Sequence, residues 1–305
     1  MFRSGLVAVF VASSLAVCAQ SSYVPLTELK NAKYEGYEGG LYPGGSNKRP
    51  AAYEAAGLRL ARQVVPRDAS GKPDANGKIG LLTVGMSNTR AESEAWGMAI
   101  RNDSEVNPHL VFVNGAQGGQ TGAIVADESG RGANYWANVD RALQQAGISA
   151  AQVQAIWLKE ADAGPSGSWV DYAKRLQQEL ATICQIVHRK FPYARLCYVS
   201  NRIYGGYATT KLNPEPYAYA SGFSVKWLIE DQIMGPSDKP KSPWLSWGPY
   251  LWANGTHPNP DGLTWSQSEF AGDGTHPNRQ GAQKVADLLM KFFKTDSTTR
   301  PWFVR

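Results

Sequence analysis

The chain has 305 residues, which is enough for one large α/β domain with an N-terminal extension. Its hydrophobic content of 43% and charged content of 19% are typical of a globular protein. The formal net charge is +5 and the pI is about 9.0, but the lysines and arginines are scattered without a long basic run. This pattern indicates a solvated surface and argues against nucleic acid as a partner.

Residues 1–19 resemble a secretory signal peptide. Arg3 supplies a positive start, and small residues precede Gln20. The apolar stretch between them, about a dozen residues, is shorter than a normal membrane span, so we predict an exported protein without a stable span. Residues 15–18 also resemble a lipoprotein box with Cys18 as the anchor, but the bulky Val17 before it makes anchoring the less favoured alternative.

Two cysteines remain after the signal, on a predicted helix and on the strand that follows it. Export permits a disulfide between Cys184 and Cys197, and two buried free thiols are the alternative. Neither cysteine has the spacing of a metal ligand, and the chain has no Cys/His cluster. The sequence therefore predicts no metal and no cofactor.

Strands and helices alternate along most of the chain. Apolar runs predict buried strands over residues 81–84, 110–113, 153–158 and 196–199, with a short last strand over 250–252. Helical spacing predicts helices over residues 50–65, 88–102, 135–146, 168–190, 217–233 and 280–293. This alternation predicts an α/β fold with a doubly wound parallel sheet over residues 78–305, preceded by an N-terminal arm, helix and loop over 20–77.

Ser87 lies where the first of these strands turns into a helix. The strand ends at Gly85, so Ser87 faces the crevice at the carboxyl edge of the sheet, where α/β proteins place their chemistry. A helix N-terminus also supplies N–H groups for a developing negative charge. The alternative is that Ser87 is a plain helix N-cap. A nucleophilic role requires a base elsewhere in the chain.

A candidate base comes from a motif that occurs twice, Gly-Thr-His-Pro-Asn. In the second copy Asp273 lies three residues before His276 on a glycine-containing turn. The carboxylate can therefore hold one imidazole nitrogen while the other faces Ser87. The first copy has Asn254 in place of the aspartate, and an amide is a poor partner for an imidazolium, so His257 is the weaker candidate.

These motifs together resemble those of the SGNH/GDSL hydrolase superfamily over roughly residues 78–294. They are Gly-x-Ser after the first sheet strand, a glycine loop after the second, and a late Asp-Gly-x-His-Pro before the last helix. Residues 85–88, Gly-Met-Ser-Asn, and residues 160–162, Glu-Ala-Asp, are closer to the carbohydrate acetylesterase and sialate O-acetylesterase branch. The resemblance implies a three-layer α/β/α, flavodoxin-like fold and ester hydrolysis through an acyl-enzyme.

The resemblance also implies roles for individual residues. Ser87 is the expected nucleophile, His276 the base and Asp273 the carboxylate that orients it. The N–H groups of Ser87 and Gly119 are the expected oxyanion hole, because Gly119 is the last glycine of the loop after the second strand. A glycine lets the backbone approach the substrate closely, although a plain turn glycine is the alternative.

The third oxyanion donor departs from the pattern of the branch, which uses a glutamine. Without a gap Leu158 falls on that glutamine and donates nothing, whereas with a one-residue gap Lys159 takes its place and can donate as a cation. Loss of one oxyanion donor typically costs about 10²–10³ in rate. Lys159 is therefore the predicted third donor, and a catalytically weak carbohydrate-binding relative is an alternative to an efficient enzyme.

The candidate substrate-binding residues follow the serine, the glycine loop and the later strand ends: Asn88, Gln120, Glu160, Asp162 and Arg202. For Glu160 and Asp162, the alternatives are to position Lys159 or Arg202, or to form an ordinary polar loop. Four tryptophans precede the histidine motif and suit a sugar-binding cleft, with ordinary packing as the alternative: Trp244, Trp247, Trp252 and Trp265.

The sequence thus predicts an exported serine esterase that removes acetyl or other small acyl groups, with carbohydrate as the favoured carrier. Its expected partner is a small-molecule or polysaccharide ester. A lipase-like or thioesterase-like member of the same superfamily remains the alternative among enzymes.

Overall fold

The computed structural model describes residues 23–235 and 241–305. The predicted signal peptide and Cys18 lie outside the described residues. Five parallel strands form the central sheet in the order β4-β3-β5-β6-β7. Their bounds are β3 Ile79–Gly85, β4 Leu110–Asn114, β5 Val153–Lys159, β6 Leu196–Val199 and β7 Trp244–Trp247.

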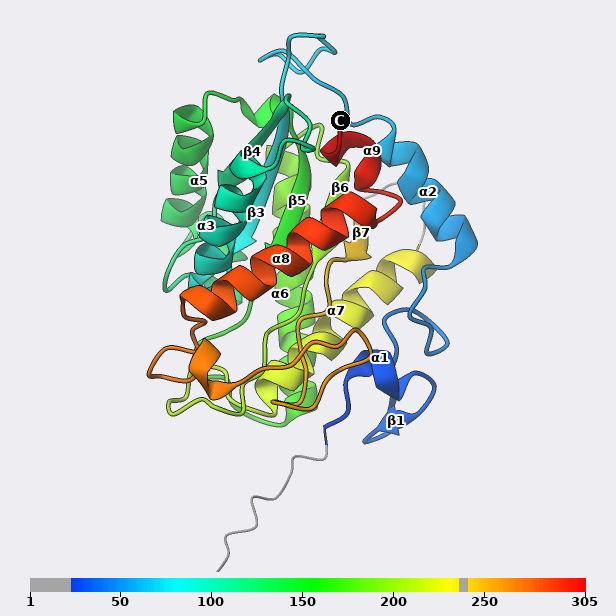
Figure 1. Ribbon diagram of the computed structural model, residues 1–305, viewed down its shortest axis with the longest axis vertical. Coiled ribbons are helices and arrows are strands. Elements are labelled where there is room, and N and C mark those ends of the chain that lie inside the picture. The colour runs from blue at the N-terminus through cyan, green and yellow to red at the C-terminus, as the bar shows by residue number, and fades with distance from the viewer. Residues whose placement is uncertain (1–22, 236–240) are drawn as a thin grey trace, which may run out of the picture.

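Helices cover both faces of this sheet (Figure 1). One face carries α2 (Ala51–Ala61), α3 (Ser87–Asn102), α8 (Arg279–Thr295) and α9 (Arg300–Phe303), and the other carries α5 (Ala133–Gln145), α6 (Trp169–Lys190) and α7 (Tyr217–Met234). Each face of the sheet carries its own apolar core, because the side chains of a buried strand such as β5 point alternately to the two faces. Ala155 and Trp157 pack with α3 and α8, whereas Ile156 and Leu158 pack with α6. The predicted α/β fold with a parallel sheet is therefore confirmed.

The last strand differs from the prediction. Strand β7 is Trp244–Trp247, paired with β6 from Leu196↔Trp244 to Val199↔Trp247, and not residues 250–252. Residues 250–252 instead continue past the carboxyl edge of the sheet, where Leu251 N–H donates to Asn201 Oδ1 at 2.8 Å. Strand β7 has only four residues and follows a segment rich in proline and lysine, so its apolar pattern is too short to predict a strand.

Several short elements were not predicted, because they contain too few residues to show a period. They are α1 (Leu26–Leu29), β1 (Lys33–Tyr34), β2 (Tyr37–Glu38), α4 (Gly122–Val125), α9, and the 3₁₀ turns η1 (Ala150–Gln152) and η2 (Gln267–Glu269). Among them, α4 follows the glycine loop and η2 precedes the histidine motif, so both lie close to predicted site residues along the chain.

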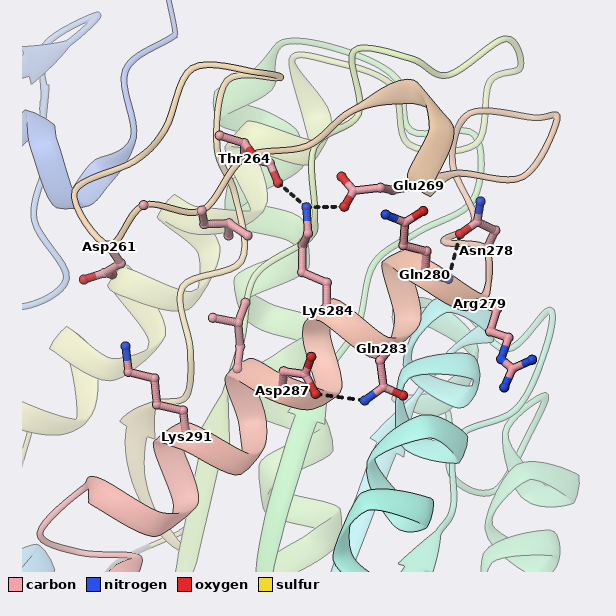
Figure 2. A pocket seen from close by; sticks show the side chains of 13 residues that line it. Asp261, Thr264, Glu269, Asn278, Arg279, Gln280, Gln283, Lys284, Asp287 and Lys291 are labelled. Carbon is pink, nitrogen blue, oxygen red and sulfur yellow. Dashed lines mark hydrogen bonds and ion pairs between the residues drawn. The ribbon is translucent and has the colours of Figure 1, made fainter.

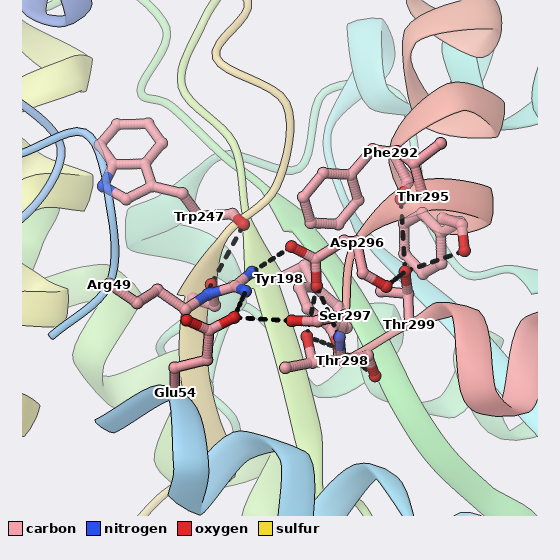
Figure 3. A network of polar contacts seen from close by, with 12 residues as sticks. Arg49, Glu54, Tyr198, Trp247, Phe292, Thr295, Asp296, Ser297, Thr298 and Thr299 are labelled. Atoms are coloured by element: carbon pink, nitrogen blue, oxygen red, sulfur yellow. Dashed lines mark hydrogen bonds and ion pairs between the residues drawn. The ribbon is translucent and has the colours of Figure 1, made fainter. Parts of the chain in front are cut away.

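The region before residue 78 packs onto the sheet domain. Leu26 and Tyr42 lie in the core beside α7. A polar network (Figure 3) adds Arg49, whose Nη2 is 2.7 Å from Asp296 Oδ2, and Glu54, which accepts a hydrogen bond from Ser297. The N-terminal and C-terminal segments are thereby joined across the edge of the sheet.

Two further expectations concern the disulfide and membrane-spanning helices. Cys184 and Cys197 are both buried in the core and their sulfurs are not bonded to each other, which corresponds to the free-thiol alternative. Within residues 23–235 and 241–305, no helix has the length and apolar character needed to cross a membrane.

Candidate active site

A serine, a histidine and an aspartate form a hydrogen-bonded chain at the carboxyl edge of the sheet. Ser87 is the first residue of α3, directly after β3, and its Oγ lies 2.7 Å from His276 Nε2. The other ring nitrogen of His276, Nδ1, lies 2.5 Å from Asp273 Oδ2. All three residues are partly exposed. This order, hydroxyl to imidazole to carboxylate, is what a general base needs to take the serine proton.

The turn that carries the histidine also holds the aspartate ionised. Asp273 Oδ1 accepts the backbone N–H groups of Thr275 and His276, both at 3.0 Å. Burial alone would raise the pKa of Asp273, but the hydrogen bonds from His276 and Thr275 outweigh it and lower the pKa below its ordinary value. Asp273 therefore stays an acceptor for the imidazole at neutral pH.

Neighbouring loops fix the position of this turn. Gly274 has φ +65°, and a Cβ there would lie 1.8 Å from the Tyr207 carbonyl oxygen, so only glycine fits. The carbonyl of Asp273 accepts the N–H of Thr209 at 3.0 Å. The loop after β6 thus packs against the Asp273–His276 turn and holds it through the Thr209 hydrogen bond.

The glycine loop after β4 lies against the serine turn. Gln117 N–H donates to the Gly85 carbonyl at 2.9 Å, and Gly122 N–H donates to the Ala161 carbonyl at 3.1 Å. Between these two anchors Gly119 is exposed with φ +74°. Within the described chain its N–H donates no hydrogen bond, so it is available together with the N-terminal N–H of α3 at Ser87. The roles of these two N–H groups as oxyanion donors stay predictions.

Lys159 does not have the surroundings expected of a third oxyanion donor. Its Nζ lies 2.6 and 2.7 Å from the two carboxylate oxygens of Glu92, and the two side chains are 1% and 0% exposed. Burial lowers the pKa of Lys159 to about 8 and raises the pKa of Glu92, because both charges are removed from water. A residue of α3, remote from the strand-end motif, thus provides Lys159 with a buried partner, and the role of Lys159 as an oxyanion donor stays a prediction.

The predicted substrate-binding residues divide into two groups. Asn88 is buried and its Nδ2 donates to the Thr275 carbonyl at 2.9 Å, while Glu160 and Arg202 are 2% and 3% exposed. These three belong to the interior. Gln120 is partly exposed beside Gly119, and Asp162 accepts the Ala123 N–H at 3.2 Å, so both remain at the rim of the glycine loop.

The buried members leave polar atoms without partners in the described chain. Glu160 Oε2 accepts the N–H of Ala161 at 3.0 Å, but Glu160 Oε1 and Arg202 Nε have no hydrogen-bond partner there. Burial raises the pKa of Glu160 and lowers the pKa of Arg202. Glu160 and Arg202 therefore form part of a buried polar cluster behind the serine turn.

The aromatic residues near the site differ from those expected. Trp244, Trp247, Trp252 and Trp265 are all buried, which matches ordinary packing rather than a cleft lining. The rings that are partly exposed are Tyr204 and Tyr207, on the loop that supports Asp273. Their centroids are 5.0 Å apart, and Tyr207 packs on Phe270 at 5.5 Å. The sequence does not predict this placement of Tyr204 and Tyr207, because no spacing relates them to the histidine motif.

A groove of about 1080 Å³ runs along α8 beside residues 261–264 (Figure 2). Most of its lining side chains are charged or carry amides. Among them, Lys284 Nζ donates a hydrogen bond to the Thr264 carbonyl and forms an ion pair with Glu269. None of Ser87, Asp273 and His276 lines it. The groove therefore lies apart from the triad.

Comparison with known proteins gives only remote similarity. No family model and no curated protein matches the chain. Among solved structures, the chain is similar at 14% identity to a candidate SGNH hydrolase from Slackia heliotrinireducens, covering 71% of this chain and 99% of that one, with a TM-score of 0.38. It is also similar at 14% identity to a Bacillus subtilis protein, covering 71% and 56% with a TM-score of 0.40.

A third structure, described as a candidate platelet activating factor from Streptococcus pneumoniae, is 14% identical over 79% of this chain and 92% of that one, with a TM-score of 0.40. These TM-scores are low. The fold is therefore assigned from its own strand order, and the site from its own geometry.

Proposed function

We propose that this protein is a serine hydrolase of the SGNH type that cleaves carboxylic esters through an acyl-enzyme on Ser87. One observation carries the proposal, the hydrogen-bonded chain from Ser87 Oγ through His276 to Asp273. A serine that only caps a helix does not require a histidine ring nitrogen 2.7 Å from its hydroxyl. Helix capping also does not require an ionised carboxylate bonded to the second nitrogen of that histidine.

In the first half of the reaction, Ser87 Oγ attacks the ester carbonyl carbon while His276 Nε2 takes the hydroxyl proton. The carbonyl oxygen becomes an oxyanion, which the N–H groups of Ser87 and Gly119 stabilise at the positive end of α3. The tetrahedral intermediate collapses, the ester C–O bond breaks, and His276 returns its proton to the leaving alcohol. Asp273 stabilises the imidazolium in both steps.

In the second half, water attacks the acyl-enzyme and His276 takes a proton from it. The second tetrahedral intermediate releases the carboxylic acid, and Ser87 recovers its proton. No step requires a group from outside the chain other than ester and water.

We further propose that the acyl group is acetyl or similarly small and that the alcohol is a carbohydrate outside the cell. The resemblance of residues 85–88 and 160–162 to carbohydrate acetylesterases supports the acyl group, and residues 1–19 support export. The partly exposed rings of Tyr204 and Tyr207 beside the Asp273 loop suit a sugar face. A lipase-like enzyme would instead prefer long acyl chains.

Hydrolysis of p-nitrophenyl acetate tests the reaction, with p-nitrophenyl octanoate as the competitor for acyl length. The acetate is expected to be the better substrate. His276→Ala should lower kcat by at least about 10³, as in other triad deletions. His257→Ala is the matched control, because His257 lies exposed on the first copy of the motif, and it should keep most of the activity. The reverse ranking of the two histidines would contradict the proposal.

A further inference from the structure

A fully buried ion pair lies behind the serine turn and has no part in the reaction steps above. Lys159 is the last residue of β5, and Glu92 lies in the second turn of α3, the helix that begins at Ser87. The Lys159 ammonium contacts both carboxylate oxygens of Glu92, and neither side chain is more than 1% exposed. The pair therefore joins the nucleophile's helix to the neighbouring strand.

The backbone of Lys159 contacts the same turn. Thr89 Oγ donates to the Lys159 carbonyl at 2.6 Å. Gly85 is in register with Lys159 across the sheet, and a Cβ on Gly85 would lie 2.3 Å from that carbonyl oxygen. Strand β5 thus contacts the serine turn before the nucleophile at Gly85 and after it at Thr89, and the ion pair with Glu92 is the charged part of that contact.

The surroundings of the pair make its two charges interdependent. Burial disfavours each charge, and their mutual attraction offsets that cost only while both are present. Arg202, after β6, adds a second buried positive charge near both, and the negative charge of Glu160 also acts on the lysine. Removal of one partner leaves the other uncompensated, whereas removal of both takes away equal and opposite charges and leaves the net charge of the cluster unchanged.

We propose that Glu92 and Lys159 act as one unit of positioning residues, which holds the start of α3 so that the Ser87 hydroxyl and N–H meet the substrate correctly. Lys159 acts through Glu92 and does not donate to the oxyanion. The inference rests on the proposed esterase function. It predicts that the neutral pair can replace the charged pair, which a direct oxyanion donor does not permit.

The experiment compares Lys159→Met, Glu92→Gln and the double variant Glu92→Gln/Lys159→Met on p-nitrophenyl acetate. The kcat is expressed per active site titrated with a fluorophosphonate, so that unfolded protein does not count. Each single variant should lower kcat by about 10-fold to 10²-fold with KM within about twofold, because a small displacement of the nucleophile has costs of this size. The double variant should recover to within about threefold of wild type, because it removes both charges of the pair together and leaves Arg202 with Glu160 and Glu215 as nearby carboxylates.

Two other patterns would overturn the inference. If Lys159 donates to the oxyanion, Lys159→Met and the double variant are equally slow and Glu92→Gln is not. If the pair only stabilises the fold, the single variants are less stable but have wild-type kcat per titrated site.

Lys226→Met is the matched control, since Lys226 is also a buried lysine paired with a glutamate, Glu230, but on α7. It should lose stability and keep its kcat. An inactive wild type that does not react with the fluorophosphonate would instead refute the proposed function, so the two failures are distinguishable.

Discussion

Asn88 Nδ2 donates a hydrogen bond to the Thr275 carbonyl at 2.9 Å and thereby joins the turn of the nucleophile to the turn of the base. The two residues are 187 positions apart in the chain. The distance between Ser87 and His276 depends on this contact, because each catalytic residue is the immediate neighbour of one of the bonded residues.

We expect Asn88→Ala to lower kcat by about 10-fold to 10²-fold with little change in KM, since the two turns lose a shared anchor. Steady-state kinetics on p-nitrophenyl acetate measures this. A raised KM with an unchanged kcat would mean that Asn88 binds substrate instead, as its place in the sequence motif predicts.

Gly274 allows a second prediction. Gly274→Ala should lower both the melting temperature and kcat, because φ is +65° and the new Cβ would meet the Tyr207 carbonyl oxygen. A left-handed conformation alone costs a residue with a Cβ about 1–2 kcal/mol. Gly272→Ala serves as the control, since nothing lies within 4 Å of its added Cβ. Thermal unfolding of both variants decides, and equal melting temperatures would show that the turn adapts.

The pH dependence of kcat should reflect Lys159. Below pH 8 the lysine is charged and paired with Glu92, and as the pH rises through about 8 it loses its proton and the pairing. We expect kcat to fall through this range in the wild type. The fall should be absent in Glu92→Gln/Lys159→Met, and its persistence there would assign it to another group.

Unfolding does not explain that fall. In the unfolded chain Lys159 keeps its proton up to its ordinary pKa of about 10.4. Between pH 8 and that value the unfolded state therefore binds more protons at this site, and the contribution of Lys159 to the free energy of unfolding rises with pH. Melting temperatures measured across the same range separate the two effects.

Tyr204 tests the proposed carbohydrate. Tyr204→Leu should raise KM for an acetylated oligosaccharide several-fold, since aromatic contacts are worth about 0.5–1.5 kcal/mol. Its kinetics on p-nitrophenyl acetate should not change. Tyr193→Leu, a partly exposed tyrosine just before β6 at the opposite edge of the sheet, is the control. Equal effects of the two variants would exclude Tyr204 from a sugar subsite.

The sequence predicted those features that depend on local pattern. The apolar run before Gly85 and the spacing of Asp273 and His276 are such patterns, and both elements lie where expected. The partner of Lys159 was not predictable, because Glu92 is 67 residues away and its side chain looks like any polar residue of a helix. The Asn88 contact was missed for the same reason. The motif around Asn88 predicts substrate binding, whereas its side-chain amide bonds to the Thr275 carbonyl in the fold.

Labelling with a fluorophosphonate, followed by peptide mass spectrometry, tests the central claim most directly. The phosphonate should add once, on Ser87, in the wild type, and should not add in Ser87→Ala, a variant expected to keep the fold and to lose ester hydrolysis. Labelling at another residue, or full hydrolytic activity in a clean Ser87→Ala sample, would contradict the account.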